Sequence, residues 1–171
     1  VLRAMWQRVG QQLRLVTPGT NAKRGVFGAL DLRTGTWHYT LTTRKRAVEF
    51  LAFLQGLLEA YPCGRVYVIV DNAAIHTSRA VRAWLEGQCR LELVYLPTYS
   101  GHQLNPVEKV WWALKGVIAA NRSFRSLAEL DGAIARFFAA FTPEAAIRLT
   151  NSDLTRAAQA AAKSDENFLR P

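Results

Sequence analysis

A continuous apolar run that ends in an acid and an amide stands at Arg65–Asn72, which reads RVYVIVDN. Such a run, rich in β-branched residues, is typical of a short strand covered on both faces in an α/β protein. Asp71 then stands at the carboxyl end of the strand, where open α/β sheets bind ligands. The run therefore predicts an α/β fold with a candidate metal or substrate ligand at one strand end. A turn or capping role is the alternative for this aspartate.

The segments after this run alternate between helix and strand patterns. A helix is expected from Ser78, its N-cap, to about Gln88, and a strand is expected over Leu91–Leu96. Two further helices are expected over about 106–120 and 126–141, the second with Ser126 and Glu129 in the spacing of a capping box.

The segments before the run predict a β-hairpin and a helix. The hairpin strands are expected over Arg24–Leu32 and Thr36–Thr42, with a turn at residues 33–35. Apolar residues at helical spacing over Arg44–Ala60 predict the helix. A hairpin followed by alternating helices and strands indicates a layered α/β fold with a mixed sheet.

The composition fits one folded domain with a tail. The chain has 171 residues, half of them hydrophobic, and a mean hydropathy of −0.02. We expect a domain over residues 1–145 and a helical or flexible tail over residues 146–171. No apolar run reaches the roughly 20 residues of a membrane span, and no secretory leader pattern is present, so a cytoplasmic protein is expected. Cys63 and Cys89 lack the spacing of a zinc site and are expected to be reduced.

The net charge of +9 is unevenly distributed. Residues 1–46 contain nine basic residues and one acid, and residues 97–126 contain four basic residues and one acid. A basic run is often only a solvated surface, but two separated basic segments are typical of proteins that contact phosphates. The expected partner is nucleic acid in preference to a membrane, because no basic amphipathic helix is evident.

One acid stands within the second basic segment. Glu108 ends the stretch LPTYSGHQLNPVE and is the only acid between residues 93 and 128. The helix dipole would stabilise a carboxylate in this first helical turn in any case. However, Lys115 follows on the same helix face, so a carboxylate for a metal and an ammonium for a phosphodiester would lie together. Trp111 and Trp112 are interpreted as core packing in preference to base stacking.

Two motifs resemble those of DDE transposases. The first is Val70-Asp71-Asn72-x-x-x-His76, and the second is Leu96-Pro97-x-Tyr99-Ser100-x-x-x-Leu104-Asn105-Pro106-Val107-Glu108-x-x-Trp111. The sequence is similar to the bacterial IS630 group, which is related to the Tc1/mariner elements. This similarity extends from about Trp6 to about Leu130.

The resemblance implies an RNase H-like fold, with a mixed sheet flanked by helices, in the catalytic domain of a DNA transposase. In this family three carboxylates hold two divalent ions, normally Mg²⁺, for which Mn²⁺ can substitute. The ions activate water to nick transposon ends and then activate the 3′-hydroxyl that joins target DNA, in accordance with the two-metal scheme. Asp71 matches the second acid and Glu108 the third, so both are expected to be catalytic metal ligands. Double-stranded DNA is the expected partner, a homodimer remains open, and the expected location is the bacterial cytoplasm, at the nucleoid.

The first acid of the family has no match in this chain. In the family it lies on the first, central strand, upstream of the region that resembles Trp6–Gly10, so we expect that strand to be missing. Asp31 is the only acid before Glu49, but the sequence around it does not match, and it is not assigned. Gly101 stands where the family usually has proline. Without the central strand two strand edges would be open, and the isolated chain is expected to be poorly stable.

The resemblance also suggests supporting and DNA-binding residues. His76 matches the family's histidine five residues after the second acid, although a structural role near a helix start is the alternative. Asn72 and Asn105 are expected to orient the carboxylates. Basic side chains expected to contact DNA phosphates without reading sequence are Arg24, Arg44, Lys45, Arg46, Lys109, Lys115 and Arg122.

Three functions remain compatible with the sequence. The first is a transposase domain that cleaves transposon ends and transfers the strands, with end recognition in a domain outside this chain. The second is a truncated, inactive remnant that only binds DNA, which the missing first acid and the start at Val1 favour. The third is another RNase H-like nuclease that acts on RNA–DNA hybrids or DNA junctions. The Asn-Pro-Val-Glu segment argues against the third, because it resembles transposases specifically.

Overall fold

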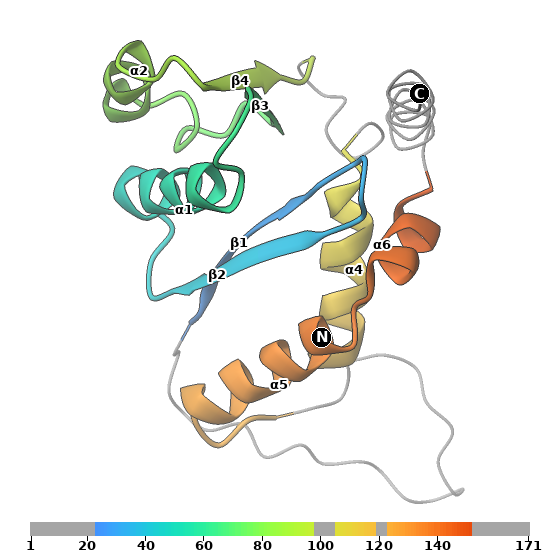
Figure 1. The fold of residues 1–171 in the computed structure, drawn as a ribbon. Helices are drawn as coiled ribbons and strands as arrows, with labels where there is room; N and C mark the ends of the chain where they lie inside the picture. The colour runs from blue at the N-terminus through green and yellow to red at the C-terminus, as the bar shows by residue number, and fades with distance from the viewer. Residues whose placement is uncertain (1–22, 98–104, 119–122, 152–171) are drawn as a thin grey trace, which may run out of the picture.

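A computed structural model describes residues 23–97, 105–118 and 123–151 of the chain. Within these residues the chain forms a mixed α/β fold of four strands and five helices (Figure 1). The strands are β1 (Gly25–Leu30), β2 (Trp37–Thr42), β3 (Val66–Val70) and β4 (Leu91–Tyr95). The helices are α1 (Ala47–Ala60), α2 (Arg79–Glu86), α4 (Val107–Ile118), α5 (Leu127–Ala139) and α6 (Pro143–Thr150). The predicted α/β class is confirmed.

Strands β1 and β2 form the predicted hairpin. They pair antiparallel, from Gly25 opposite Thr42 to Leu30 opposite Trp37. The turn closes through a hydrogen bond of 2.8 Å from the backbone N–H of Gly35 to the carbonyl of Asp31. Gly35 has a φ of +80°, which favours glycine because a side chain would strain this conformation. The sequence therefore sets the position of the turn.

Strands β3 and β4 pair in parallel and are joined by α2. The expected coverage of β3 on both faces is wrong within the described part of the chain. Val70 is buried on the face that packs against the helices, but Tyr67, on the other face, is 57% exposed. The helices that the structure describes next to this sheet pack on one face of it, and a run of apolar letters cannot reveal that.

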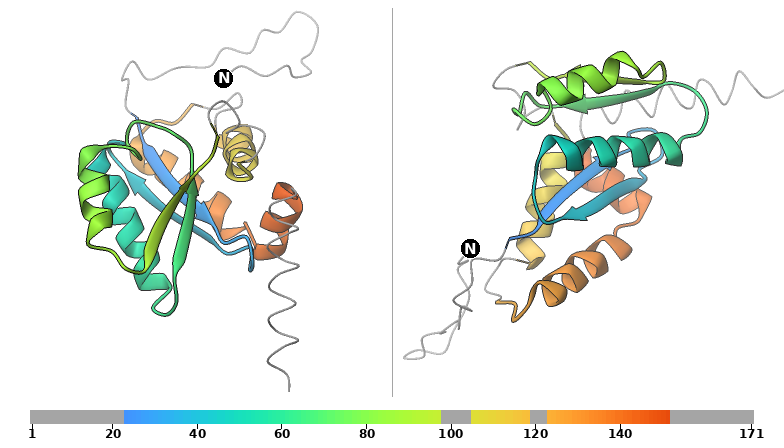
Figure 2. Two further views of the ribbon diagram at one scale, coloured as in Figure 1. Left: turned by 90° about the horizontal axis from the view of Figure 1, so that it is seen from above. Right: turned by 90° about the vertical axis from the view of Figure 1, so that its left-hand side faces the viewer.

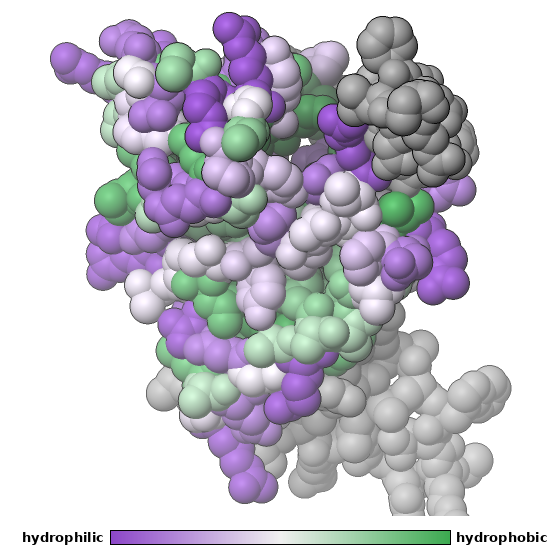
Figure 3. Space-filling model, in the orientation of Figure 1, coloured by the Kyte–Doolittle hydropathy of each residue, from purple (hydrophilic) through white to green (hydrophobic). Residues whose placement is uncertain are grey.

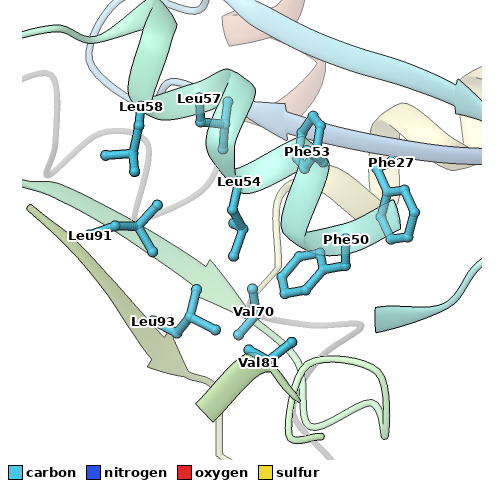
Figure 4. Close-up of a cluster of buried hydrophobic side chains, with 10 residues drawn as sticks. All are labelled: Phe27, Phe50, Phe53, Leu54, Leu57, Leu58, Val70, Val81, Leu91 and Leu93. Carbon is cyan, nitrogen blue, oxygen red and sulfur yellow. The ribbon is translucent and has the colours of Figure 1, made fainter. Parts of the chain in front are cut away.

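The larger core cluster surrounds α1. Phe50 and Phe53 of α1 pack with Phe27 of β1, and Leu54, Leu57 and Leu58 lie in the same cluster as Val70, Leu91 and Leu93 of the parallel strands (Figure 4). Val81 of α2 completes this group of buried side chains. One helix thus packs against both pairs of strands, although the described residues hydrogen-bond them into two separate sheets.

The second core cluster lies on the other face of the hairpin. Val110 and Leu114 of α4 pack with Ile134 and Phe138 of α5, and Trp37 of β2 stacks on Phe138 at 5.3 Å between ring centroids. The hairpin therefore separates α1 from α4 and α5, as the two views of Figure 2 show. Apolar side chains of this layer reach the surface between β2 and α5 in Figure 3.

The helix starts follow the predicted capping residues. The Ser78 hydroxyl accepts the backbone N–H of Val81, and the Ser126 hydroxyl accepts that of Glu129. The expected capping box at Ser126 is only half formed, because the Glu129 carboxylate accepts the backbone N–H of Arg125 at 2.8 Å. Helix α6 lies across the boundary expected between residues 145 and 146, with Ala146 buried in the packed structure. The division into domain and tail stays a prediction.

Candidate functional site

Asp71 follows β3 directly, and its side chain is 49% exposed. Its Oδ1 accepts the backbone N–H of Ala73 at 3.0 Å and lies 2.9 Å from Nδ1 of His76. Nδ1 of His76 also lies 3.2 Å from the backbone carbonyl of Asp71. The strand end and the turn after it therefore hold this carboxylate in place while leaving half of it accessible to a ligand.

His76 is held between this carboxylate and the core. Its ring centroid lies 4.5 Å from that of Phe50 in α1, and its side chain is only 15% exposed. Its backbone carbonyl accepts the hydroxyl of Tyr95, at the end of β4, at 3.0 Å. Sequence reasoning selected His76 but missed Phe50 and Tyr95, because strand and helix residues of these types normally indicate packing alone.

Asn72 connects the ends of the two parallel strands. Its side-chain Nδ2 donates to the carbonyl of Leu96 at 2.7 Å, one residue beyond the end of β4. This bond fixes the turn that carries Asp71 relative to the neighbouring strand. Asn72 therefore holds the backbone next to Asp71, and its expected role in orienting the carboxylate stays a prediction.

Glu108 lies in the first turn of α4 and is exposed. Asn105 supports this turn twice: its side-chain Oδ1 accepts the N–H of Val107 at 3.2 Å, and its carbonyl accepts the N–H of Glu108 at 3.1 Å. Asn105 thus fixes the start of the helix, and with it the position from which the Glu108 side chain extends. Residues 98–104 of the second motif, which include Tyr99, Ser100 and Gly101, lie outside the described residues.

The structure groups these residues in two places. Asp71, Asn72 and His76 lie together at the carboxyl end of β3, while Asn105 and Glu108 lie together at the start of α4. Figure 1 shows the ends of β3 and β4 and the first turn of α4 on the same side of the molecule. Among the described residues, no three acidic, histidine or cysteine side chains form a group that could hold a metal ion. The two expected ligands thus lie at one side of the molecule, and the part of the chain that the structure describes places no third acid in a metal-binding group with them.

Two of the expected DNA-binding arginines have protein partners. The guanidinium of Arg24 binds both carboxylate oxygens of Asp131 in α5, with Nε 2.7 Å from Oδ1, and its side chain is 17% exposed. The guanidinium of Arg46 binds Glu49 in the first turn of α1, with Nε 3.0 Å from Oε1. The Arg24 pair connects the start of β1 to α5, and its sequence separation of 107 residues concealed it, whereas the Arg46 pair is local to the start of α1.

The other expected DNA-binding residues differ in setting. Nζ of Lys109 donates to the carbonyl of Asn151 at 3.3 Å, and Lys109 is exposed. Arg44 and Lys45 are exposed between β2 and α1, and Lys115 is exposed on α4. Arg122 lies outside the described residues.

Asp31 belongs to a separate hydrogen-bonded group at the hairpin turn. Its Oδ2 accepts the hydroxyl of Tyr61 at 2.9 Å, and Nε2 of His38 lies 3.0 Å from the same hydroxyl. Burial by itself raises the pKa of Asp31, but hydrogen bonds from the Arg33 N–H, the Tyr61 hydroxyl and Thr34 outweigh it and lower the pKa. Burial lowers the pKa of His38, against the opposing charge of Asp31. This group joins the hairpin turn to the end of α1.

None of the helices in the described ranges combines the length and the apolar character that a membrane crossing requires.

The comparisons with known proteins agree with the motifs. Residues 1–131 match the family described as DDE superfamily endonuclease. The chain is 35% identical over 141 residues to the insertion element IS630 uncharacterized 39 kDa protein of Shigella sonnei. That match covers 82% of this chain and 41% of the relative, so the chain spans less than half the length of the relative.

Two solved structures have a similar fold. The Mos1 strand transfer complex gives a TM-score of 0.65 at 25% identity, over 95% of this chain and 49% of that one. The Mos1 mariner paired end complex with Mn gives a TM-score of 0.64 at 23% identity, over 95% of this chain and 50% of that one.

Proposed function

Because the chain belongs to the DDE superfamily endonuclease family, in its IS630/Tc1-mariner group, we propose that it is the catalytic domain of a transposase that cuts transposon ends and transfers them into target DNA. Since the chain spans 41% of its IS630 relative, the activity of a whole protein belongs to this proposal. The observation that carries it is the half-exposed carboxylate of Asp71, held at the carboxyl end of a parallel strand where α/β proteins bind ligands.

The proposal includes an RNase H-like sheet in which a further strand lies between β1 and β3. In the described residues β1 pairs only with β2 and β3 only with β4, so each keeps one edge without a strand. Helix α1 packs against Phe27 of β1 and Val70 of β3 within one core cluster, as expected if both belong to one layer. The first acid of the family would be carried on this further strand.

Asp71 and Glu108 fit the chemistry of a Mg²⁺ site. Both offer carboxylate oxygens, the ligands that Mg²⁺ prefers, and Mg²⁺ keeps several waters, so few protein ligands are needed. Bound ions would polarise the phosphodiester and supply the nucleophile at neutral pH. In this chain His76 and the Ala73 N–H hold the Asp71 carboxylate, and Asn105 fixes the helix start that carries Glu108. Two ions, with Mn²⁺ as substitute, belong to the proposal, since one mariner neighbour is a complex with Mn.

The remaining parts of the proposal concern DNA and assembly. Exposed Arg44, Lys45, Lys109 and Lys115 would contact phosphates, which position DNA without reading its sequence. The proposal also includes a homodimer and action at DNA in the bacterial cytoplasm, the latter because the relative belongs to a bacterial insertion element.

A nicking assay tests the proposal. The chain is incubated with supercoiled plasmid and MgCl₂, and nicking is compared with that of Asp71→Asn and Glu108→Gln, both expected to fall to background. Glu92→Gln is the matched control, because Glu92 is an exposed acid on β4 and its loss should leave nicking unchanged. Equal nicking by the chain and Asp71→Asn would refute the metal role of Asp71. DNA binding without nicking by the unmutated chain would instead favour the inactive, DNA-binding remnant.

A further inference from the structure

The two adjacent tryptophans of α4 have different surroundings. Trp111 packs against the hairpin, with its ring centroid 5.3 Å from that of Trp37 and the planes at 74°. Trp112 is 66% exposed. The interpretation of both as core residues is therefore confirmed for Trp111 and wrong for Trp112. A single exposed apolar side chain is ordinary on a protein surface, so what surrounds Trp112 decides its meaning.

The surroundings of Trp112 are those of the candidate site. Glu108, Trp112 and Lys115 are four and three residues apart in turn, so they lie on one face of α4. Val110 and Leu114, which are 0% and 4% exposed, form the opposite, buried face. The exposed ring thus stands one turn from the Glu108 carboxylate, with the Lys115 ammonium one turn further on.

We propose that the Trp112 ring stacks on an unpaired base of the DNA strand that binds next to Glu108, while Lys115 contacts a neighbouring phosphate of that strand. This inference rests on the proposed function. Proteins hold single strands by combining cations for the backbone with aromatic rings for the bases, and stacking tolerates any sequence because every base has a π-face. The basic character of the α4 segment, with Glu108 as its only acid, complements the negative charge of such a strand.

A stacking role has a consequence that a general phosphate contact lacks. In a duplex the faces of the bases are covered by their neighbours, so Trp112 can stack only on a nucleotide that is unpaired or at a strand end. Removing the ring should weaken the binding of DNA with an unpaired 3′ overhang and leave blunt duplex binding unchanged. Removing the Lys115 charge should weaken both forms equally, because phosphates are present in both.

The experiment measures binding of the 171-residue chain to a fluorescent blunt duplex and to the same duplex with a 3′ thymidine overhang, in EDTA so that nothing is cut. Trp112→Ala should bind the overhang DNA about 5- to 150-fold more weakly, the range for losing one stacked base. Trp112→Phe should recover part of this loss, and overhang DNA should quench its tryptophan emission less than that of the unmutated chain. Val117→Ala is the matched control, since Val117 is a 46% exposed apolar residue on the same helix but away from the Glu108 face.

The outcomes separate this inference from the proposed function. If the unmutated chain binds both DNA forms and Trp112→Ala binds them equally well, the stacking role is overturned and the proposed function stands. An equal loss on both forms also overturns it, because it would indicate a general surface effect. If the unmutated chain binds neither form, the proposed function fails and the inference fails with it. A selective loss on the overhang, rescued by phenylalanine and absent in Val117→Ala, supports it.

Discussion

At the scale of single residues, Tyr61 connects the hairpin turn to the end of α1. Its hydroxyl donates its only proton to Asp31, so the contact with Nε2 of His38 requires that nitrogen to carry the hydrogen. A chain of donors therefore runs from His38 through Tyr61 to Asp31. Asp31 was left unassigned at the sequence level, and its hydrogen bonds give it a structural role within the described residues.

Tyr61→Phe should reduce the free energy of unfolding by about 1–2 kcal/mol, because it removes one hydrogen bond to a charged acceptor and leaves His38 without this partner. Urea unfolding at one fixed protein concentration measures the change. Tyr67→Phe serves as control, since Tyr67 is exposed on β3 and losing its hydroxyl should cost almost nothing. Equal effects of the two substitutions would contradict the role of the Tyr61 hydroxyl.

The lowered pKa of Asp31 predicts how the stability contributed by this residue depends on pH. A carboxyl whose pKa is lower in the folded state stabilises the protein fully above its unfolded value of about 3.9. That contribution disappears as the pH falls through the folded pKa, because the folded protein then takes up the same proton. Asp31→Asn should therefore be less stable than the unmutated chain at neutral pH, and the difference should shrink below about pH 4. Urea unfolding across this range checks the prediction; a difference that grows in acid would contradict it.

At the scale of elements, the hairpin packs closely against α4 through Gly28. A Cβ added there would lie 2.4 Å from the Trp37 ring and 2.7 Å from the Trp111 ring. Gly28→Ala should therefore lower the free energy of unfolding by about 1–3 kcal/mol through overpacking. Gly56→Ala is the matched control, because Gly56 lies within α1 with nothing within 4 Å of an added Cβ, and alanine there should stabilise by about 0.5–1 kcal/mol. Thermal unfolding of both variants measures these opposite signs; destabilisation by both would contradict the packing argument.

The sequence predicted the helices, strands and turns better than it predicted the contacts between them. The Ser78 and Ser126 caps and the hairpin turn depend on neighbours in the chain, and all three are confirmed. The exposure of Tyr67 and the pairing of Arg24 with Asp131 depend on distant segments, so no local pattern could reveal them. The same holds at the candidate site. The strand end predicted Asp71, and the family resemblance predicted Asn72 and His76, but only the folded structure shows that Phe50 and Tyr95 contact His76.

At the scale of the whole molecule, strand edges that are unpaired within the described residues bear on how the chain behaves. In the described residues α1 holds both pairs of strands in one core, yet β1 and β3 each hydrogen-bond to a single neighbour. Unpaired edges recruit strands from other molecules unless a charge or a covering segment prevents it. Within the described residues, the chain therefore combines a packed interior with strand edges that have no second strand beside them.

We predict that the isolated chain self-associates through these edges and that its monomer has low stability. Tyr67→Lys should shift the population toward monomer, because lysine on an edge strand disfavours pairing. Light scattering during size-exclusion chromatography, over a wide range of protein concentration, measures the shift. Val48→Lys is the matched control, since it adds the same charge at an exposed site on α1. If both lysines act equally, net charge and not the edge controls association. If the unmutated chain stays monomeric and unfolds in one sharp transition, the strand edges do not drive self-association and the prediction is wrong.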